Sequence, residues 1–470
     1  MNNNKLDKLI QKVLIIIYSL IGLGIIILSV NNNILLSILL ITFLIIIYLI
    51  TKKYNFKINK IFENKKLFLI ILIIPLLIRL LLLVFNYPEL YSDEATFYNN
   101  AVAISGNKSL TNEYIATFPY LYPYIYLLGI IFKIFGTNYK VVVLTNIIID
   151  LIGSFITYKF FENIKDKKSA KISLLIWLYN PFQIIWNVKC LPVIIVNTLI
   201  ILSLYIFSIL YKKISNIKHN ILFSIILGIV LSIANSNRPI MIIFIIALFI
   251  YYVYLLIIKK NKPKELIISF VLIFVLFEFG NILTRNIVSD KTEYEVAKSS
   301  GGWSLYLGSS YDTSGQWYPV DKFGELIYSD DFTPTKTHDY FQKEAIKRYK
   351  DNGINNLILI PKKANVLVSS FDEFSVNNLY SKLNIPIPKI IINILSKLFW
   401  LTLILTNLFI IKLKKDDIIR YFPYLLFFIG VILASLLVEV SPRYFTPNLV
   451  VLTIGMTLFL SNNYIKERSD

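Results

Sequence analysis

The sequence has little of what most soluble enzymes use for chemistry. It holds one cysteine and two histidines, and only 16% of its 470 residues are charged, well below the roughly 25% of soluble domains. Cys190 has no partner for an intramolecular disulfide, and His219 and His338 stand far apart in no ligand-spaced motif. The sequence therefore argues against a zinc site. A carboxylate-bound Mg²⁺ or Mn²⁺ remains open, because these ions prefer oxygen ligands.

Long apolar runs take the place of the missing charge. Apolar residues make up 56% of the chain and its mean hydropathy is +0.64. Stretches such as LFLIILIIPLLIRLLLLVF approach the roughly 20 residues that cross a bilayer. The formal charge of +19 comes from short lysine clusters between these runs, so it indicates membrane topology rather than nucleic-acid binding. The chain is predicted to be an all-α polytopic membrane protein.

The lysine clusters predict which apolar runs cross the membrane, because cytoplasmic loops are enriched in Lys and Arg. If every run crossed, the clusters after the third run would fall on the outer side. The run at 119–135, PYLYPYIYLLGIIFKIF, begins with prolines and tyrosines and is expected to be interfacial or re-entrant. About 12 transmembrane helices remain, at 10–30, 33–50, 67–86, 139–161, 172–187, 193–211, 221–236, 240–258, 266–284, 388–411, 420–438 and 446–462.

Four segments follow from this topology. Residues 1–66 form an N-terminal hairpin with a basic inner loop, and residues 67–284 a transmembrane module with a first outer loop at 87–138. Residues 285–386 form a nearly neutral extracytoplasmic segment, and 387–470 the last transmembrane helices. The outer segment is expected to be small and of mixed structure. A helix is predicted over THDYFQKEAIKRYKDNG, with Gly353 as its stop.

Polar residues are expected to gather at the outer ends of the spans. They occur in four short motifs: Tyr91-Ser92-Asp93-Glu94, Trp186-Asn187-Val188-Lys189, Asn237-Arg238-Pro239 and Glu439 to Tyr444. Arginine suits a phosphate because its planar fork stays protonated and donates paired hydrogen bonds. A carboxylate suits the deprotonation of an acceptor hydroxyl. Together they predict a lipid-linked sugar phosphate bound by Arg238, Arg443 and Lys189, with Asp93 as the base.

Each of these residues also has a structural interpretation. Asp93 and Glu94 could simply be a solvated helix end, and Arg238 an interfacial anchor. Glu439 and Arg443 could form a local i,i+4 pair, and Lys189 could extend toward the headgroups.

Other polar and aromatic residues also have both a functional and a structural interpretation. Arg79 lies inside an apolar run and needs a partner or a cavity. The aromatic residues of the outer segment, Trp303 and Trp317 with Tyr306 and Tyr311, could stack on sugars or form a membrane-surface belt. Tyr98 and Glu439 are further candidates for sugar or acceptor contacts.

These motifs resemble, in order and spacing, those of the C-type glycosyltransferase superfamily. The chain is similar over about 67–462 to the bacterial relatives of protein O-mannosyltransferases and aminoarabinose transferases, glycosyltransferase family 39 and its neighbours. The similarity runs through SDEATFYNNAVAISG, FPYLYPYIYLLGIIFKIFG, the Arg-Pro turn at 238–239 and VEVSPRYFTPNLVVL. The chain departs from the family at Phe118, where relatives have proline, and in its extra spans before residue 67.

The resemblance implies a function and a set of site residues. It implies inverting transfer of a sugar from a polyprenyl-phosphate donor to a glycan, lipid or protein acceptor at the outer face of a bacterial cytoplasmic membrane. Asp93 would be the general base, and Glu94 would assist it or orient the acceptor. Arg238 and Arg443 would hold the lipid phosphate beside Tyr444. The implied fold is a helical bundle with juxtamembrane helices in the first outer loop.

Two other functional classes stay open at this point. A transporter or lipid flippase would place its polar residues near the bilayer midplane, in helices broken by Gly or Pro. A polysaccharide polymerase or ligase would also act at the outer face, and the large segment at 285–386 is compatible with it.

Overall fold

The protein is described by a computed structural model. It describes residues 3–31, 33–53, 64–87, 90, 92–108, 110, 113–259, 262–297, 301–329, 331, 333–408 and 415–464. Tyr91 of the first polar motif and most of the lysine cluster at 51–66 lie outside the described residues.

The described residues form helices and loops, without a strand. The first half holds α1 (Asn3–Asn31), α2 (Ile34–Lys53), α4 (Lys65–Leu81), η1 (Leu82–Val84), α5 (Ser92–Ser105), α6 (Glu113–Thr117), η2 (Pro119–Leu121), α7 (Tyr122–Phe135), α8 (Tyr139–Ile164), α9 (Lys167–Leu178), α10 (Pro181–Trp186), α11 (Val193–Lys213) and α12 (Ile217–Asn237). The second half holds α13 (Met241–Tyr254), η3 (Leu255–Lys259), α14 (Pro263–Thr292), α15 (Gly301–Gly308), α16 (Asp321–Ile327), α17 (Pro334–Asn352), α18 (Asn355–Val368), α19 (Phe371–Tyr380), α20 (Lys389–Leu408), α21 (Lys415–Leu437), η5 (Pro442–Phe445) and α22 (Asn448–Tyr464).

The chain is a multi-pass integral membrane protein, as predicted. Within the described residues, 7 helices are long and apolar enough to cross a membrane: Asp7–Asn31, Lys65–Val84, Tyr139–Ile164, Val193–Lys213, Ile217–Asn237, Pro263–Thr292 and Lys389–Leu408. Shorter apolar helices of 10–17 residues are Ile34–Ile50, Pro119–Phe135, Met241–Ile257, Tyr421–Leu437 and Asn448–Asn462. The all-α prediction is confirmed in the described residues, which hold these seven candidate spans and the shorter apolar helices. The number of about 12 crossings stays a prediction.

The predicted span at 172–187 is not one helix. α9 ends at Leu178 and α10 starts at Pro181, which has no backbone N–H to donate. The side chain of Asn180 accepts a hydrogen bond from the backbone N–H of Phe182 and begins α10 as its N-cap. Lys189 follows α10 and lies in a polar cluster with Glu94.

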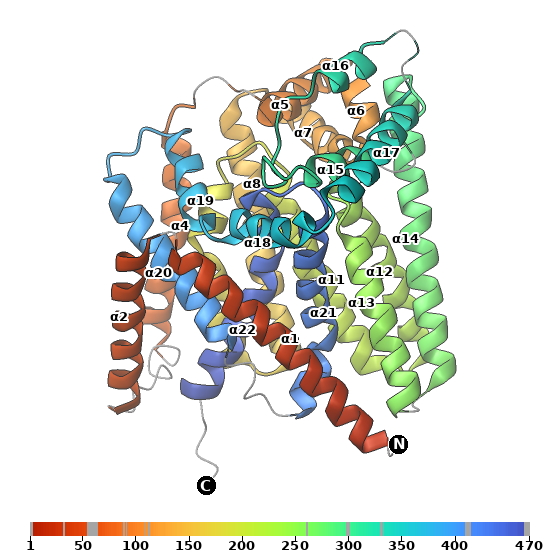
Figure 1. Cartoon of the computed structure of the whole chain (residues 1–470). Coiled ribbons are helices and arrows are strands. Elements are labelled where there is room, and N and C mark those ends of the chain that lie inside the picture. The colour runs from red at the N-terminus through yellow and green to blue at the C-terminus, as the bar shows by residue number, and fades with distance from the viewer. Residues whose placement is uncertain are drawn as a thin grey trace.

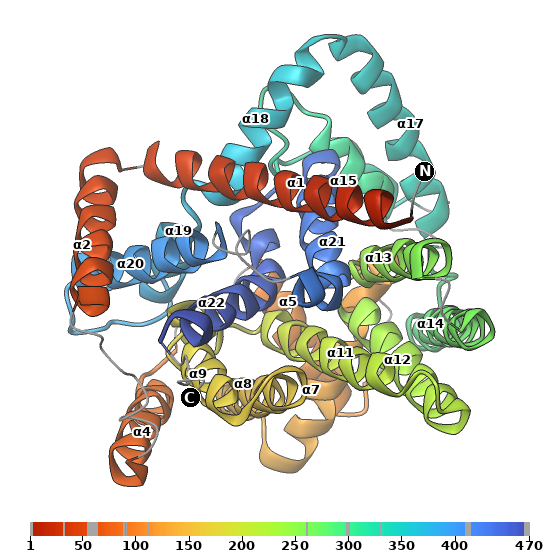
Figure 2. The same cartoon turned by 90° about the horizontal axis from the view of Figure 1, so that it is seen from below.

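The helices separate into a membrane bundle and an assembly at one end of it. Figure 1 shows α5, α6, α16 and α17 at the upper end of the bundle, with both described chain ends toward the lower end. Seen from below, α8, α11, α12 and α14 follow one another around the bundle and α4 lies at its rim (Figure 2). α7 packs chiefly against α5, so the run at 119–135 belongs to this upper assembly.

Arg79, the charged residue inside an apolar run, has a buried partner on another helix. Its Nη2 lies 2.8 Å from Oδ2 of Asp150 on α8, and both side chains are fully buried. Trp177 Nε1 donates to Asp150 at 2.8 Å, Asn187 Nδ2 donates to it at 3.1 Å, and Arg79 donates to the carbonyl oxygen of Leu178 at 2.8 Å. A buried charge that has a counter-ion and several hydrogen bonds ties α4 to the bundle.

The outer segment is helical in its described part, so the expectation of mixed structure was wrong there. The predicted helix over THDYFQKEAIKRYKDNG is confirmed as α17, and Gly353 follows it with φ of 51°. Glycine tolerates this left-handed conformation, which ends the helix.

The outer segment also contacts the backbone that leads into η5 and α22. The backbone N–H of Glu439 donates to the carbonyl oxygen of Ser304 at 2.6 Å, and that of Val440 donates to Gly315 at 2.8 Å. Gly308 at the end of α15 lies against the backbone of Val438, where a Cβ atom would collide. The outer segment therefore fixes the backbone just before Arg443.

His338 on α17 links three parts of the outer assembly. It is buried, its Nε2 lies 2.9 Å from the carbonyl oxygen of Thr117, and its Nδ1 lies 3.4 Å from the backbone nitrogen of Trp303. Because Trp303 donates, Nδ1 accepts and the ring is neutral with its proton on Nε2. Burial lowers the pKa of His338 below its ordinary 6.5.

We expect the outer segment to open more readily as the pH falls from 7.5 to 5.5. When the segment is open, His338 binds a proton near its ordinary pKa of 6.5. In the docked segment its pKa is lower, so docking is strongest above about pH 6.5 and weakens as the pH falls below that value. Each pKa unit of lowering corresponds to about a tenfold change in the opening equilibrium. Hydrogen exchange of residues 301–380 measures the change. His338→Gln keeps an acceptor and a donor without titrating, and its exchange should not show this pH dependence.

Candidate active site

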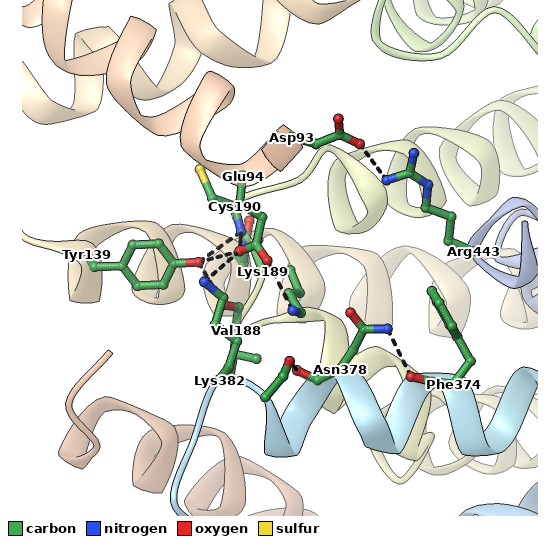
Figure 3. Close-up of polar contacts among 12 residues, drawn as sticks. Asp93, Glu94, Tyr139, Val188, Lys189, Cys190, Phe374, Asn378, Lys382 and Arg443 are labelled. Atoms are coloured by element: carbon green, nitrogen blue, oxygen red, sulfur yellow. Dashed lines mark hydrogen bonds and ion pairs between the residues drawn. The ribbon is translucent and has the colours of Figure 1, made fainter. Parts of the chain in front are cut away.

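The N-terminal turn of α5 carries the two neighbouring carboxylates. Ser92 starts the helix with φ of 55°, and Asp93 and Glu94 follow in its first turn. Acidic side chains stabilise this end of a helix because its free N–H groups carry partial positive charge. Their functional difference comes from their partners, which lie on opposite sides of the turn (Figure 3).

The side chain of Asp93 points toward η5, the short helix that precedes α22. Its Oδ2 lies 2.6 Å from Nη1 of Arg443 on η5, and these side chains are 37% and 32% exposed. The two residues are 350 positions apart, so the pair depends on the whole fold. Because both side chains remain open to solvent, a substrate can reach this ion pair.

Arg238 and Arg443 lie at the same aromatic ring. Their guanidinium carbons are 4.9 Å and 5.4 Å from the ring centroid of Tyr444. Arg238 follows α12 as its C-cap, and its Nη1 reaches Oγ1 of Thr446 at 3.5 Å. Two guanidinium groups on one ring repel each other, so this arrangement favours an anion between or beside them.

Glu439 borders the same cluster. Its side chain is 8% exposed and bonds Tyr444. Burial raises the pKa of Glu439 above its ordinary value, although Arg443 opposes the shift. Burial lowers the pKa of Arg238 to about 10, which leaves its guanidinium charged at neutral pH. The cluster around Tyr444 therefore combines two guanidinium groups with one buried carboxylate.

Glu94 faces a separate, buried cluster. Its oxygens lie 3.0 Å from Nζ of Lys189 and 3.2 Å from Nζ of Lys382, and they accept hydrogen bonds from the Tyr139 hydroxyl at 2.9 Å and the Cys190 backbone N–H at 3.2 Å. Glu94 is 12% exposed, and the two lysines are 4% and 2% exposed. With its oxygens enclosed by these partners, Glu94 is poorly placed to accept a proton from a substrate (Figure 3).

Three aromatic candidates lie elsewhere. The Tyr98 hydroxyl donates to the carbonyl oxygen of Thr137, and its ring packs 5.4 Å from that of Phe132. Trp303 is buried and stacks on Phe323 with ring centroids 4.1 Å apart. Trp317 is 63% exposed. The structure thus brings Glu439 and Tyr444 to the arginines, but places Lys189 with Glu94 and Trp303 in the core of the outer segment.

Some neighbours of the site were not among the predicted residues. Tyr114 and Tyr120 both interact electrostatically with Asp93, Tyr444 and Glu439, and burial raises the pKa of each hydroxyl. Tyr120 lies in the FPYLY stretch that carried the family resemblance, which was a usable signal. Lys382 ends the outer segment without any motif, and nothing in the sequence pointed to its contact with Glu94.

The described residues hold no group of three or more His, Cys, Asp or Glu side chains with the spacing of a metal site. The carboxylate of Asp93 has a guanidinium as its neighbour rather than further acidic ligands. These residues do not fit a resident divalent ion.

Part of the chain matches a known protein family. Residues 119–279 match the family described as dolichyl-phosphate-mannose-protein mannosyltransferase. Among solved structures, the chain is similar to the archaeal oligosaccharyltransferase AglB from Archaeoglobus fulgidus in complex with an inhibitory peptide and a dolichol-phosphate. That match has 14% identity and a TM-score of 0.48, and it covers 85% of this chain and 50% of that one.

A second solved structure is the Archaeoglobus fulgidus oligosaccharyltransferase tethered to an acceptor peptide containing the NVT sequon. It matches with 12% identity and a TM-score of 0.48, again over 85% of this chain and 50% of that one. The chain therefore spans about half the length of these two proteins. A direct comparison with curated proteins gave no match. The predicted resemblance is confirmed over residues 119–279, the part of the chain that matches the dolichyl-phosphate-mannose-protein mannosyltransferase family.

Proposed function

We propose that the chain is an inverting glycosyltransferase that moves a sugar from a polyprenyl-phosphate donor to an acceptor hydroxyl. The observation that carries this proposal is the solvent-open pair of Asp93 and Arg443, 2.6 Å apart, with Arg238 on the same tyrosine ring. A carboxylate beside two guanidinium groups offers a proton acceptor and a phosphate site together.

The donor phosphate binds to Arg238 and Arg443 through charge-assisted hydrogen bonds. As the bond between the anomeric carbon and the phosphate oxygen breaks, negative charge grows on the leaving phosphate, and the two guanidinium groups stabilise it. The acceptor oxygen attacks the anomeric carbon from the opposite face and passes its proton to Asp93. This single displacement inverts the anomeric centre and leaves polyprenyl phosphate on the arginines.

The neighbouring Glu94 cluster fixes the start of α5. Lys189 follows α10 and Lys382 follows α19, so their ion pairs with Glu94 hold α5 to two other parts of the fold. In this proposal Glu94 and Lys189 position Asp93 rather than contact the sugar.

The site lies at the extracytoplasmic face of a bacterial cytoplasmic membrane in this proposal. The upper assembly of Figure 1 holds α5 together with α16 and α17 of the nearly neutral outer segment, while basic loops fall between the spans. Such loops face the cytoplasm by the positive-inside rule. The shorter helices α2, α13, α21 and α22 would complete the crossings, which gives an arrangement of about 12 passes with α9 and α10 counted as one broken span.

Arg238→Lys tests the phosphate site. Lysine keeps the charge but loses the paired donors, so we expect the donor KM to rise roughly tenfold to a hundredfold, with a smaller effect on the acceptor KM. The measurement is sugar transfer from a synthetic polyprenyl-phosphate hexose by the full chain in liposomes.

Arg285→Lys is the matched control, because this arginine lies on α14 and outside the Tyr444 cluster. An unchanged donor KM in Arg238→Lys would contradict the assigned phosphate contact. Absence of transfer by the wild-type chain from any polyprenyl-phosphate sugar would contradict the proposed function itself.

A further inference from the structure

A polar cavity opens beside the catalytic pair. It has a volume of about 440 Å³ and is lined by Ala95, Thr96, Asn99, Asn100, Glu113, Tyr114 and Tyr328. This volume falls within the range of small-molecule sites, about 300–1,000 Å³. Four of the seven lining residues come from α5, the helix that begins with Asp93, and the others from α6, its neighbour along the chain, and the end of α16. These three helices gather at the upper end of the molecule (Figure 1).

Asp93 does not line the cavity, but it begins the helix that forms most of the cavity wall. Thr96 and Asn100 lie three and seven positions after Asp93, a spacing that puts all three on one face of a helix. Tyr114 lines the cavity and also interacts electrostatically with Asp93, Arg443 and Glu439. The cavity therefore lies along the same face of α5 as the proton acceptor and shares Tyr114 with its surroundings, and neither Arg238 nor Arg443 forms its wall.

The wall chemistry selects for an uncharged compound rich in hydroxyl groups. Asn99 and Asn100 offer amide groups, Thr96 a hydroxyl and Glu113 a carboxylate. Asn100 Nδ2 already donates to the carbonyl oxygen of Thr96 at 2.7 Å, which leaves its Oδ1 to accept from a ligand. Glu113 Oε1 already accepts a hydrogen bond from the Tyr294 hydroxyl at 2.8 Å, which leaves its Oε2 for a ligand. Neighbouring hydroxyls of a sugar can bond to such amide and carboxylate groups.

Tyr328 adds an aromatic surface at this cavity. Its side chain is 80% exposed, so a ligand can reach its ring. An exposed ring next to hydrogen-bonding groups is well suited to the C–H face of a sugar.

The same wall disfavours the other acceptor classes. None of the lining residues is Lys or Arg and one is Glu, so a phosphorylated or otherwise anionic acceptor would meet like charge. Ala95 is the only aliphatic member of the lining, which gives an acyl chain little to bind. The described residues hold no strand edge to which an extended peptide could add its backbone hydrogen bonds.

We propose that this cavity is the acceptor subsite and that its occupant is a neutral glycan. This inference rests on the proposed function, since it names the acceptor of the same transfer. Asn99, Asn100 and Tyr328 bind the glycan, and Glu113 accepts a hydrogen bond from one of its hydroxyls without taking part in the displacement.

The test measures binding and transfer separately with the full chain in nanodiscs. The binding probe is a set of neutral hexose and N-acetylhexosamine di- and trisaccharides, observed by saturation-transfer NMR. The transfer assay supplies polyprenyl-phosphate hexose with these glycans, a serine- and threonine-containing peptide or a diacylglycerol as the acceptor. We expect binding of at least one neutral glycan and transfer to it in preference to the peptide and the lipid.

Asn99→Leu and Asn100→Leu should raise the acceptor KM at least tenfold and weaken glycan binding to match, while the donor KM stays within twofold. Asn378→Leu is the matched control, because Asn378 donates to the carbonyl oxygen four residues earlier on α19 at 2.9 Å, as Asn100 does on α5. Tyr328→Ala, at an exposed position, should reduce binding without loss of folded protein.

Each outcome decides the inference. Transfer to the peptide or the lipid alone, or an acceptor KM that the three variants leave unchanged, would overturn it and leave the proposed function standing. Glycan binding that the variants abolish, without transfer to any acceptor, would support the subsite and overturn the proposed function. Absence of glycan binding by the wild-type chain would overturn the subsite.

Discussion

Replacing Asp93 by Asn is expected to lower the rate of sugar transfer by about 100-fold to 10,000-fold while the chain still folds and inserts. Asparagine has the size of aspartate but cannot accept the acceptor proton, and general-base catalysis contributes a factor of this order. The side chain is 37% exposed, so the change costs little packing. Initial rates of transfer from polyprenyl-phosphate hexose in liposomes measure the effect, with both substrates saturating.

Two controls separate the base from its surroundings. Asp312→Asn alters an exposed aspartate of the outer segment and should leave the rate unchanged. Donor binding by Asp93→Asn, measured with labelled polyprenyl phosphate, should persist because Arg238 and Arg443 remain. A variant that keeps more than a tenth of the wild-type rate would contradict the role of Asp93 as base.

The second large effect concerns the buried ion pair that joins α4 to the bundle. Asp150→Asn should lower the free energy of unfolding by about 3–5 kcal/mol, because it leaves the fully buried guanidinium of Arg79 without a counter-ion. Unfolding in mixed micelles of increasing dodecyl sulfate content measures this change.

A double variant and an exposed pair provide the comparison. Arg79→Met combined with Asp150→Asn should recover most of the lost stability, since the unpaired charge is gone. Glu162→Gln breaks the pair with Lys159, whose side chains are 27% and 39% exposed, and should change stability by less than about 1 kcal/mol. If the free energy of unfolding of Asp150→Asn is within about 1 kcal/mol of that of the wild type, the ion pair does not stabilise the fold as proposed.

Composition and the spacing of the lysine clusters predicted the fold class and the location of most helices. Apolar length is set by the membrane, so runs such as 193–211 and 266–284 lie within α11 (Val193–Lys213) and α14 (Pro263–Thr292), although α14 continues eight residues beyond its run. The span at 172–187 was misjudged because hydropathy is the same on both sides of the break at Asn180 and Pro181. The pairing of Arg79 with Asp150 could have been inferred, since each is a charge of opposite sign inside an apolar run.

The site was predictable where a motif marks it and not where the tertiary fold alone makes it. Asp93, Arg238, Arg443 and Tyr444 each stood in a short polar motif between apolar runs, and the structure brings them together. Glu94 shares the motif of Asp93, yet the opposite direction of its side chain assigns it to the lysines. That direction depends on α10 and α19 reaching the start of α5, which no local pattern records.

A structure of the chain with polyprenyl phosphate bound is the most direct test of the central claim. We expect density for the phosphate within hydrogen-bonding distance of the guanidinium groups of both Arg238 and Arg443. The carboxylate of Asp93 should face the cavity beside Tyr114. Phosphate density at Lys189 and Lys382 instead, or at neither cluster, would contradict the central claim.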